Sequence, residues 1–185
     1  MGDTGDPPRD VQADSPYPLQ ATLRDGTHVT IRPIGPRDEA REQAFVRGLS
    51  DESRYFRFMN TLRELTPGML HRFTDPDPDR ELALVALVGA EEDPRQVAVA
   101  RFVATATGDA AEFAIVVADD MQGKGLGTRL MHELIRSARA RGLRQLEGTV
   151  LASNHPMLAL MLALGFEVGA APDDQRLRRV VKALH

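Results

Sequence analysis

Residues 122–128 read QGKGLGT, and this glycine-rich segment is the part of the chain whose residue types could do chemistry. The apolar run FAIVV at 113–117 precedes it, and an amphipathic segment at 126–141 follows it. A strand, a glycine loop and a helix in this order let backbone N–H groups grip a phosphate. Alternating glycines allow a ligand to approach the backbone closely, and Lys124 adds a positive charge. The segment therefore predicts a binding site for a phosphorylated ligand.

Two common nucleotide-binding motifs do not fit this segment. The G-x-G-x-x-G spacing is absent, and that fingerprint belongs to the first strand of a long βαβ series. The P-loop pattern G-x-x-x-x-G-K-[ST] is absent as well. A glycine-rich helix start without any ligand is the remaining alternative, and the pattern alone does not separate it from a phosphate site.

The segments that must position this loop predict strands and helices in a mixed order. We expect strands at 19–23, 28–34, 82–88, 97–105, 112–117, 145–151, 166–168 and 177–182, and helices at 36–49, 50–60, 66–73, 126–141 and 156–164. Ser50 and Thr66 are the expected N-caps, and Gly165 is expected to end the last helix. Antiparallel hairpins followed by a strand–helix–strand unit predict an α/β or α+β fold, with one mixed sheet and helices on both faces.

The composition fits one folded domain and excludes several classes of protein. A chain of 185 residues can bury a sizeable core, and its net charge of -4 argues against coating nucleic acid or an anionic membrane. The absence of cysteine excludes disulfides, thiolate zinc sites and cysteine nucleophiles. The five histidines lack metal-ligand spacing, so we expect no metal.

The N-terminal segment and the lengths of the apolar runs indicate the cellular location. Residues 1–16 are rich in acids and prolines and predict a disordered tail, not a signal peptide, before a domain at 17–185. The apolar runs are far shorter than the ~20 residues that a transmembrane helix needs. We expect a cytoplasmic protein, and the oligomeric state stays open.

Two motifs resemble one superfamily of enzymes. Residues 117–127, VADDMQGKGLG, resemble the Gln/Arg-x-x-Gly-x-Gly/Ala signature of the GNAT N-acetyltransferases. Asn154 followed by LGF at 164–166 is similar to a later segment of that superfamily, and the resemblance covers about residues 27–168. LRDG at 23–26, IRPI at 31–34 and SRYFRF at 53–58 are similar to the acetyltransferase domain of Pat-type protein lysine acetyltransferases.

The resemblance implies a GNAT-like domain that binds acetyl-CoA between two splayed parallel strands. These are the strand that ends at Val117 and the strand at 145–151. The diphosphate would lie on the backbone N–H groups of 122–128, and the pantetheine arm would pair with 115–117 like an extra strand. The cofactor-binding residues implied in this way are Ile115, Val116, Val117, Gln122, Gly123, Lys124, Gly125, Leu126, Gly127, Thr128 and Asn154.

Glu112 is the candidate general base. Strand alternation places it on one face with Ala114 and Val116, and a lone acid stands out in this apolar segment. From the spacing alone, a solvated carboxylate at a strand start is slightly favoured. The resemblance reverses that preference, because Pat-type enzymes carry a glutamate here as general base. We predict that Glu112 removes the proton of the attacking amine, directly or through a water.

The group that protonates the departing thiolate is not apparent. Many GNAT enzymes place a tyrosine as general acid four residues before the glycine that corresponds to Gly165. This chain has Met161 there, and a core methionine is the expected role. Water, Ser153 or no group at all remain as alternatives. A thiol pKa near ~8.5 makes unassisted departure tolerable.

The resemblance and the residues together predict an N-acetyltransferase that moves an acetyl group from acetyl-CoA to an amine by direct attack. The favoured acceptor is a protein lysine side chain. A small amine is the first alternative acceptor. A non-catalytic module that senses acyl-CoA and regulates a partner is the second alternative, and acetyl-CoA turnover with amine acceptors distinguishes it from an enzyme.

Overall fold

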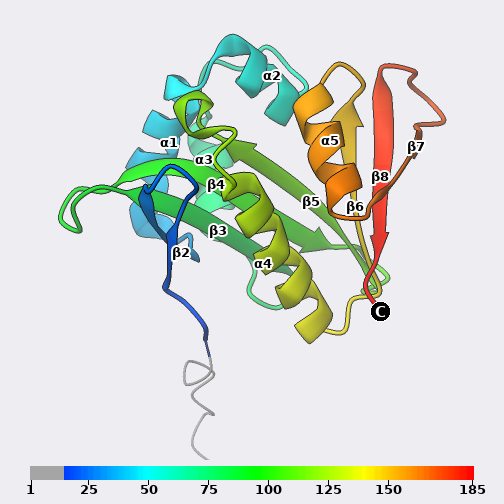
Figure 1. The fold of residues 1–185 in the computed structure, drawn as a ribbon, viewed down its shortest axis with the longest axis horizontal. Helices are drawn as coiled ribbons and strands as arrows, with labels where there is room; N and C mark the ends of the chain where they lie inside the picture. Colours follow the sequence, from blue (N-terminus) through cyan, green and yellow to red (C-terminus); the bar gives the residue numbers. More distant parts are fainter. Residues whose placement is uncertain (1–14) are drawn as a thin grey trace, which may run out of the picture.

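One mixed sheet of eight strands forms the centre of the molecule, with helices on both faces (Figure 1). This is a computed structural model, and it describes residues 15–185. The strand order is β1-β2-β3-β4-β5-β6-β8-β7, and only the β5–β6 pair is parallel among the described strands. The predicted fold class is confirmed. Most of the predicted tail, residues 1–14, lies outside the described residues.

The helices and strands have the following bounds. The strands are β1 (Leu19–Thr22), β2 (His28–Pro33), β3 (Glu81–Val88), β4 (Arg95–Ala104), β5 (Ala110–Val117), β6 (Gln145–Leu151), β7 (Glu167–Ala170) and β8 (Leu177–Ala183). The helices are α1 (Glu39–Gly48), α2 (Asp51–Phe58), α3 (Pro67–Thr74), α4 (Leu126–Ala140) and α5 (His155–Ala163). Short 3-10 turns lie at Pro36–Asp38 and Asp119–Met121.

Several predicted bounds were wrong by one to three residues. The helix expected from residue 36 begins as a 3-10 turn, and α1 starts only at Glu39. β5 starts at Ala110 and not at Glu112, because the Thr105 N–H donates to the Ala110 carbonyl and extends the β4–β5 ladder. Such extensions depend on the partner strand, which local sequence does not reveal.

Helix α4 covers one face of the central strands. Its apolar stripe, which includes Leu126, Leu130 and Leu134, is fully buried. α5 lies beside α4 on the same face, and α1 and α3 lie on the opposite face (Figure 1). The two helices that follow β5 and β6 therefore share one side, as the strand–helix–strand order requires.

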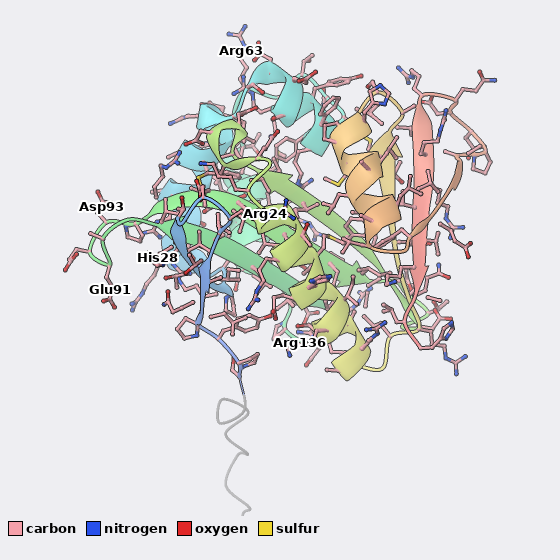
Figure 2. The ribbon with its side chains drawn as sticks, in the orientation of Figure 1. Arg24, His28, Arg63, Glu91, Asp93 and Arg136 are labelled. Atoms are coloured by element: carbon pink, nitrogen blue, oxygen red, sulfur yellow. The ribbon has the colours of Figure 1, made fainter. Side chains whose placement is uncertain are left out.

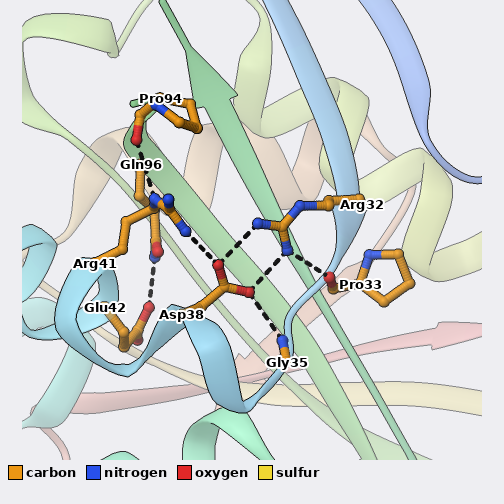
Figure 3. A network of polar contacts seen from close by, with 8 residues as sticks. All are labelled: Arg32, Pro33, Gly35, Asp38, Arg41, Glu42, Pro94 and Gln96. Carbon is orange, nitrogen blue, oxygen red and sulfur yellow. Dashed lines mark hydrogen bonds and ion pairs between the residues drawn. The ribbon is translucent and has the colours of Figure 1, made fainter. Parts of the chain in front are cut away.

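A buried polar network fixes α1 against the sheet on the other face (Figure 3). The Asp38 carboxylate, which is 2% exposed, accepts hydrogen bonds from Arg32 of β2 and from Arg41 of α1. Burial raises the pKa of Asp38, but the hydrogen bonds outweigh burial and hold the pKa below its ordinary value. Next to it, Gln96 of β4 donates to Glu42 of α1. These contacts set the position of α1 on the sheet.

Candidate active site

β5 and β6 begin side by side and then diverge (Figure 1). Parallel pairing joins only residues 110–112 to residues 145–147. β5 continues to Val117 and β6 to Leu151, yet no pairing joins these later parts. The sheet therefore contains an opening between two neighbouring strands, as the resemblance predicts.

An aromatic ring lies where the opening begins. Phe113 and Gly148 are the first residues beyond the paired segment. A Cβ atom on Gly148 would lie 2.7 Å from Cε1 of Phe113, so the ring occupies the space that any side chain would need. The ring also packs against Phe166, the residue that follows Gly165, with 5.4 Å between the two ring centres. The Phe113 ring thus lies against the Gly148 backbone at the point where β5 and β6 separate.

The opened edge of β5 carries free backbone groups. Ala118 donates to Val97 and Ala110 accepts from Thr105, so the even-numbered residues of β5 direct their backbone groups toward β4. The odd-numbered residues 113, 115 and 117 direct theirs toward β6, beyond the point where the ladder ends. The Val117 carbonyl accepts from Gln122 Nε2 at 3.1 Å. The remaining groups can pair with an extended ligand, in the manner of an added strand.

The glycine loop brings further donors to the upper end of this opening. Gly123 and Gly125 have φ values of 73° and 92°, which residues with a side chain rarely adopt. Gly125 is the N-cap of α4, and the Arg129 N–H makes the first bond back to its carbonyl. The backbone N–H groups of residues 126–128 have no partner within the helix and point out of its N-terminus. A helix of 15 residues thus presents its positive end to the cavity.

The strands, the loop and two helices line an open cavity of about 580 Å³. Its walls come from β5, the glycine loop, the end of β6, α5 and α2. Most of the residues singled out in the sequence line this cavity: Ile115, Val116, Val117, Gln122, Gly123, Gly125, Gly127, Thr128 and Asn154.

Three residues singled out in the sequence do not line the cavity. Leu126 is 1% exposed and packs in the core. Lys124 forms an ion pair with Asp25 at 2.9 Å, on the outer side of the loop. Glu112 is exposed at the closed end of the opening, on the same face of β5 as the cavity residue Ala114. The structure therefore places Glu112 beside the cavity and not in its wall.

Arg24 is a cation at the glycine loop that the sequence reasoning did not single out. Arg24 lies in the turn between β1 and β2, and its backbone N–H donates to the Lys124 carbonyl at 3.2 Å. Its Nε lies 3.4 Å from the position that a Cβ of Gly125 would take. Arg24 lines the cavity, whereas Lys124 does not. One hundred residues separate Arg24 from the loop, so no local pattern signals the contact.

Helix α2 is tied to the segment between β5 and the glycine loop. The Asp119 carboxylate accepts from the Ser50 N–H at 2.9 Å and from the hydroxyls of Ser50 and Ser53 at 2.7 Å. Burial raises the pKa of Asp119, but these hydrogen bonds outweigh burial and lower the pKa below its ordinary value. Gln122 Nε2 also approaches Ser53 Oγ at 3.4 Å. The tether holds α2 as a wall of the cavity.

The far wall of the cavity comes from the start of α5. Asn154 is the N-cap of this helix, and its Oδ1 accepts from the Met157 N–H at 3.2 Å. Its Nδ2 donates to no other residue within 15–185, which leaves that donor for a ligand. Ser153 lines the cavity as well, whereas Met161 is fully buried and faces the core.

The described part of the chain offers no site for a metal ion. Residues 15–185 contain no group of three or more histidine, aspartate or glutamate side chains placed to hold one. Within the same residues, no helix is both long and apolar enough to cross a bilayer.

The chain matches a known family. The model of the "Acetyltransferase (GNAT) family" matches residues 47–166. The chain belongs to this family and is an acetyltransferase.

Particular relatives support the same assignment. The chain is 40% identical over 153 residues to "Acetyltransferase PA5475" of Pseudomonas aeruginosa, which covers 83% of this chain and 82% of that protein. It is 34% identical over 152 residues to "Acetyltransferase Pat" of Mycolicibacterium smegmatis, covering 82% of this chain but 44% of that protein. The crystal structure of the GNAT domain of S. lividans PAT superposes with a TM-score of 0.82 at 30% identity, covering 90% of this chain and 96% of that one.

Proposed function

We propose that this chain transfers the acetyl group of acetyl-CoA to an amine by direct attack, with a protein lysine side chain as the favoured acceptor. The observation that carries the proposal is the cavity between β5 and β6, because it joins phosphate-binding donors to a free strand edge. The resemblance to Pat-type protein lysine acetyltransferases favours lysine as the acceptor, and the chain is 34% identical to "Acetyltransferase Pat" over 152 residues.

The donor half of the cavity suits a long phosphorylated thioester. The N–H groups of residues 122–128 and the Arg24 guanidinium would hold the diphosphate, because both are positive and neither is engaged by a carboxylate within 15–185. The edge formed by residues 113, 115 and 117 would pair with the amides of the pantetheine arm. The free Nδ2 of Asn154 would donate to the same arm from the opposite wall. These groups would bind and orient the thioester, and residues of β6 and α5 line the cavity beside it.

The acceptor amine must lose a proton before or during attack. A free lysine has a pKa of ~10.4, so deprotonation at pH 7 costs about 4–5 kcal/mol. We assign this step to Glu112. Its carboxylate lies on the face of β5 that also carries Ala114, and its exposure leaves room for a bridging water. A backbone N–H on the free edge of β5 would stabilise the oxyanion that forms during attack.

The position at which many GNAT enzymes carry a tyrosine supplies no acid for the departing thiolate in this chain. Met161 is buried in the core and has no proton to donate. Ser153 lines the cavity and is the one hydroxyl at the start of α5 that could donate. We propose that Ser153 or solvent protonates the thiolate, which leaves readily because a thiol pKa is near ~8.5.

Transfer of a radiolabelled acetyl group into a cell lysate tests the proposal. We expect label on protein lysines, located by peptide mapping, and a large loss of label with Glu112→Gln. Label confined to the small-molecule fraction would replace the protein acceptor by a small amine. Tight binding of acetyl-CoA with no turnover on any amine would instead identify a module that senses acyl-CoA.

A further inference from the structure

Arg57 of α2 is a cavity residue that the transfer of the acetyl group does not yet use. It lines the cavity together with Ala114 of β5. Its guanidinium carbon lies 4.9 Å from the ring centre of Phe58 and 5.8 Å from that of Phe73. The two aromatic rings hold the guanidinium in place by cation–π attraction, but they accept no hydrogen bonds from its N–H groups.

The charge around Arg57 is not balanced. Arg101 of β4 is 8% exposed, and its guanidinium carbon lies 4.7 Å from the ring centre of Phe73. Arg57, Phe58, Phe73, Arg101 and Glu42 form one cluster. The one acid that faces both arginines is Glu42. Glu81 acts on Arg101 as well, so Glu42 is the one acid that acts on Arg57, and burial raises the pKa of Glu42. Burial and then repulsion from Arg101 lower the pKa of Arg57 to about 10, so that Arg57 still carries its charge at neutral pH.

The hydrogen bonds of the cluster leave Arg57 as the free member. Arg101 donates to the Phe73 carbonyl at 2.5 Å, and Glu42 accepts from Gln96. The Arg57 guanidinium donates a hydrogen bond to no group within residues 15–185, whereas its backbone N–H belongs to helix α2. The Arg57 side chain is half-buried and lines the cavity, so an anion that entered the cavity could reach its guanidinium and pair with it. The planar fork of a guanidinium can form two parallel hydrogen bonds to a carboxylate.

The position of Arg57 places it away from the phosphate-binding end. Ser53, one helical turn earlier in α2, contacts Asp119 and Gln122 beside the glycine loop. Arg57 lies about 6 Å further along the helix axis, toward Ala114 and the closed end of the opening. That direction leads to Glu112, the assigned base. Arg57 therefore borders the acceptor half of the cavity.

We infer that Arg57 binds a carboxylate carried by the amine acceptor, and that the acceptor is an amine with an anionic group close to it. The inference rests on the proposed transfer to an amine and adds the class of acceptor. The carboxylate can be the main-chain carboxylate of a free amino acid or the side chain of an acidic residue next to a lysine. Both sources present the same chemistry to Arg57.

A binding experiment tests the subsite without any turnover. Acetate and acetamide are titrated separately into the acetyl-CoA complex, and the side-chain Nε–H resonance of Arg57 is followed by NMR. We expect a saturable shift with acetate and none with acetamide. Arg57→Lys identifies the resonance and keeps a cation over the two rings. The absence of a saturable shift with acetate, or an equal response to acetamide, would overturn the inference.

A kinetic experiment identifies the source of the carboxylate. Free amino acids are compared with their amides, and peptides containing Lys-Asp or Lys-Glu are compared with peptides containing Lys-Asn or Lys-Gln. We expect a preference of about 10- to 100-fold in kcat/KM for the acid member of one series, and its loss in Arg57→Gln. The affinity for acetyl-CoA should stay unchanged. Arg63→Gln is the matched control, because Arg63 is exposed and extends into solvent at the edge of the molecule (Figure 2).

The outcomes separate this inference from the proposed function. Acetylation without any preference for the acid member would overturn the carboxylate subsite and leave the acetyltransferase intact. A weaker affinity of Arg57→Gln for acetyl-CoA would move Arg57 to the donor half and overturn the inference as well. If no amine is acetylated, the proposed function fails, and the acetate titration still decides whether Arg57 binds anions.

Discussion

Replacing Gly148 by alanine should force the two splayed strands to readjust. The new Cβ would lie 2.7, 3.0 and 3.2 Å from three carbons of the Phe113 ring, whereas carbon atoms in contact prefer about 3.5–4.0 Å. The ring is buried and packs against Phe166, so it cannot move away freely. Overpacking of this kind costs about 1–3 kcal/mol. For a chain of this size we expect the melting temperature to fall by about 2–12 °C.

Urea unfolding and acetyl-CoA binding measure the two consequences of Gly148→Ala. The free energy of unfolding should fall, and the affinity for acetyl-CoA should fall with it, because Phe113 also lines the cavity. Gly169→Ala in β7 is the matched control: its Cβ would meet nothing within 4 Å, and stability should stay the same or rise slightly.

A second substitution isolates the ring as the cause. Phe113→Leu removes the ring atoms that collide with the new methyl group, so it should cost less stability in the Gly148→Ala background than in the original protein. A coupling of about 0.5–3 kcal/mol is expected from residues in direct contact. Unchanged unfolding of Gly148→Ala, or strict additivity of the two substitutions, would refute the proposed role of the ring.

Three further substitutions test other parts of the site. Glu112→Gln should lower kcat by about 10²–10⁴ with little change in acetyl-CoA affinity, and an unchanged kcat in stopped assays would remove Glu112 as the base. Asp119→Asn should lower the free energy of unfolding by about 1–2 kcal/mol at pH 7, measured in urea. Since the folded pKa of Asp119 is lowered, its contribution is present above the ordinary carboxyl pKa and is lost as pH falls through the lowered value, so both proteins should converge in acid. Gly125→Ala should weaken acetyl-CoA binding, measured by calorimetry, whereas Gly108→Ala, with a similar positive φ away from the cavity, should cost stability alone; equal affinities of the two variants would contradict a role for the loop.

Local chemistry explains which parts of the fold could be predicted. Ser50 and Thr66 are N-caps as expected, because each side chain accepts a hydrogen bond from the N–H three residues later. The bounds predicted for the strand 145–151 agree with β6. The position of β8 between β6 and β7 could not be predicted, because it depends on pairing between segments about 30 residues apart.

The site divides in the same way. The glycine loop is visible in the sequence because positive φ values and a helix start need a contiguous pattern. Arg24 and Arg57 reach the cavity from distant segments, and only the folded chain brings them there. The arginine between Phe56 and Phe58 is visible in the sequence, but no local pattern shows that it lines a cavity.

The free edge of β5 has a consequence for how the enzyme can vary. Its donors and acceptors are main-chain groups, and every residue type except proline supplies the same pair. Side chains at these positions can therefore vary among apolar residues without loss of the main-chain contacts that we propose hold the thioester. Alanine scanning along this strand would overlook the edge altogether. Replacement of single amides by esters, or the insertion of proline, would expose its contribution.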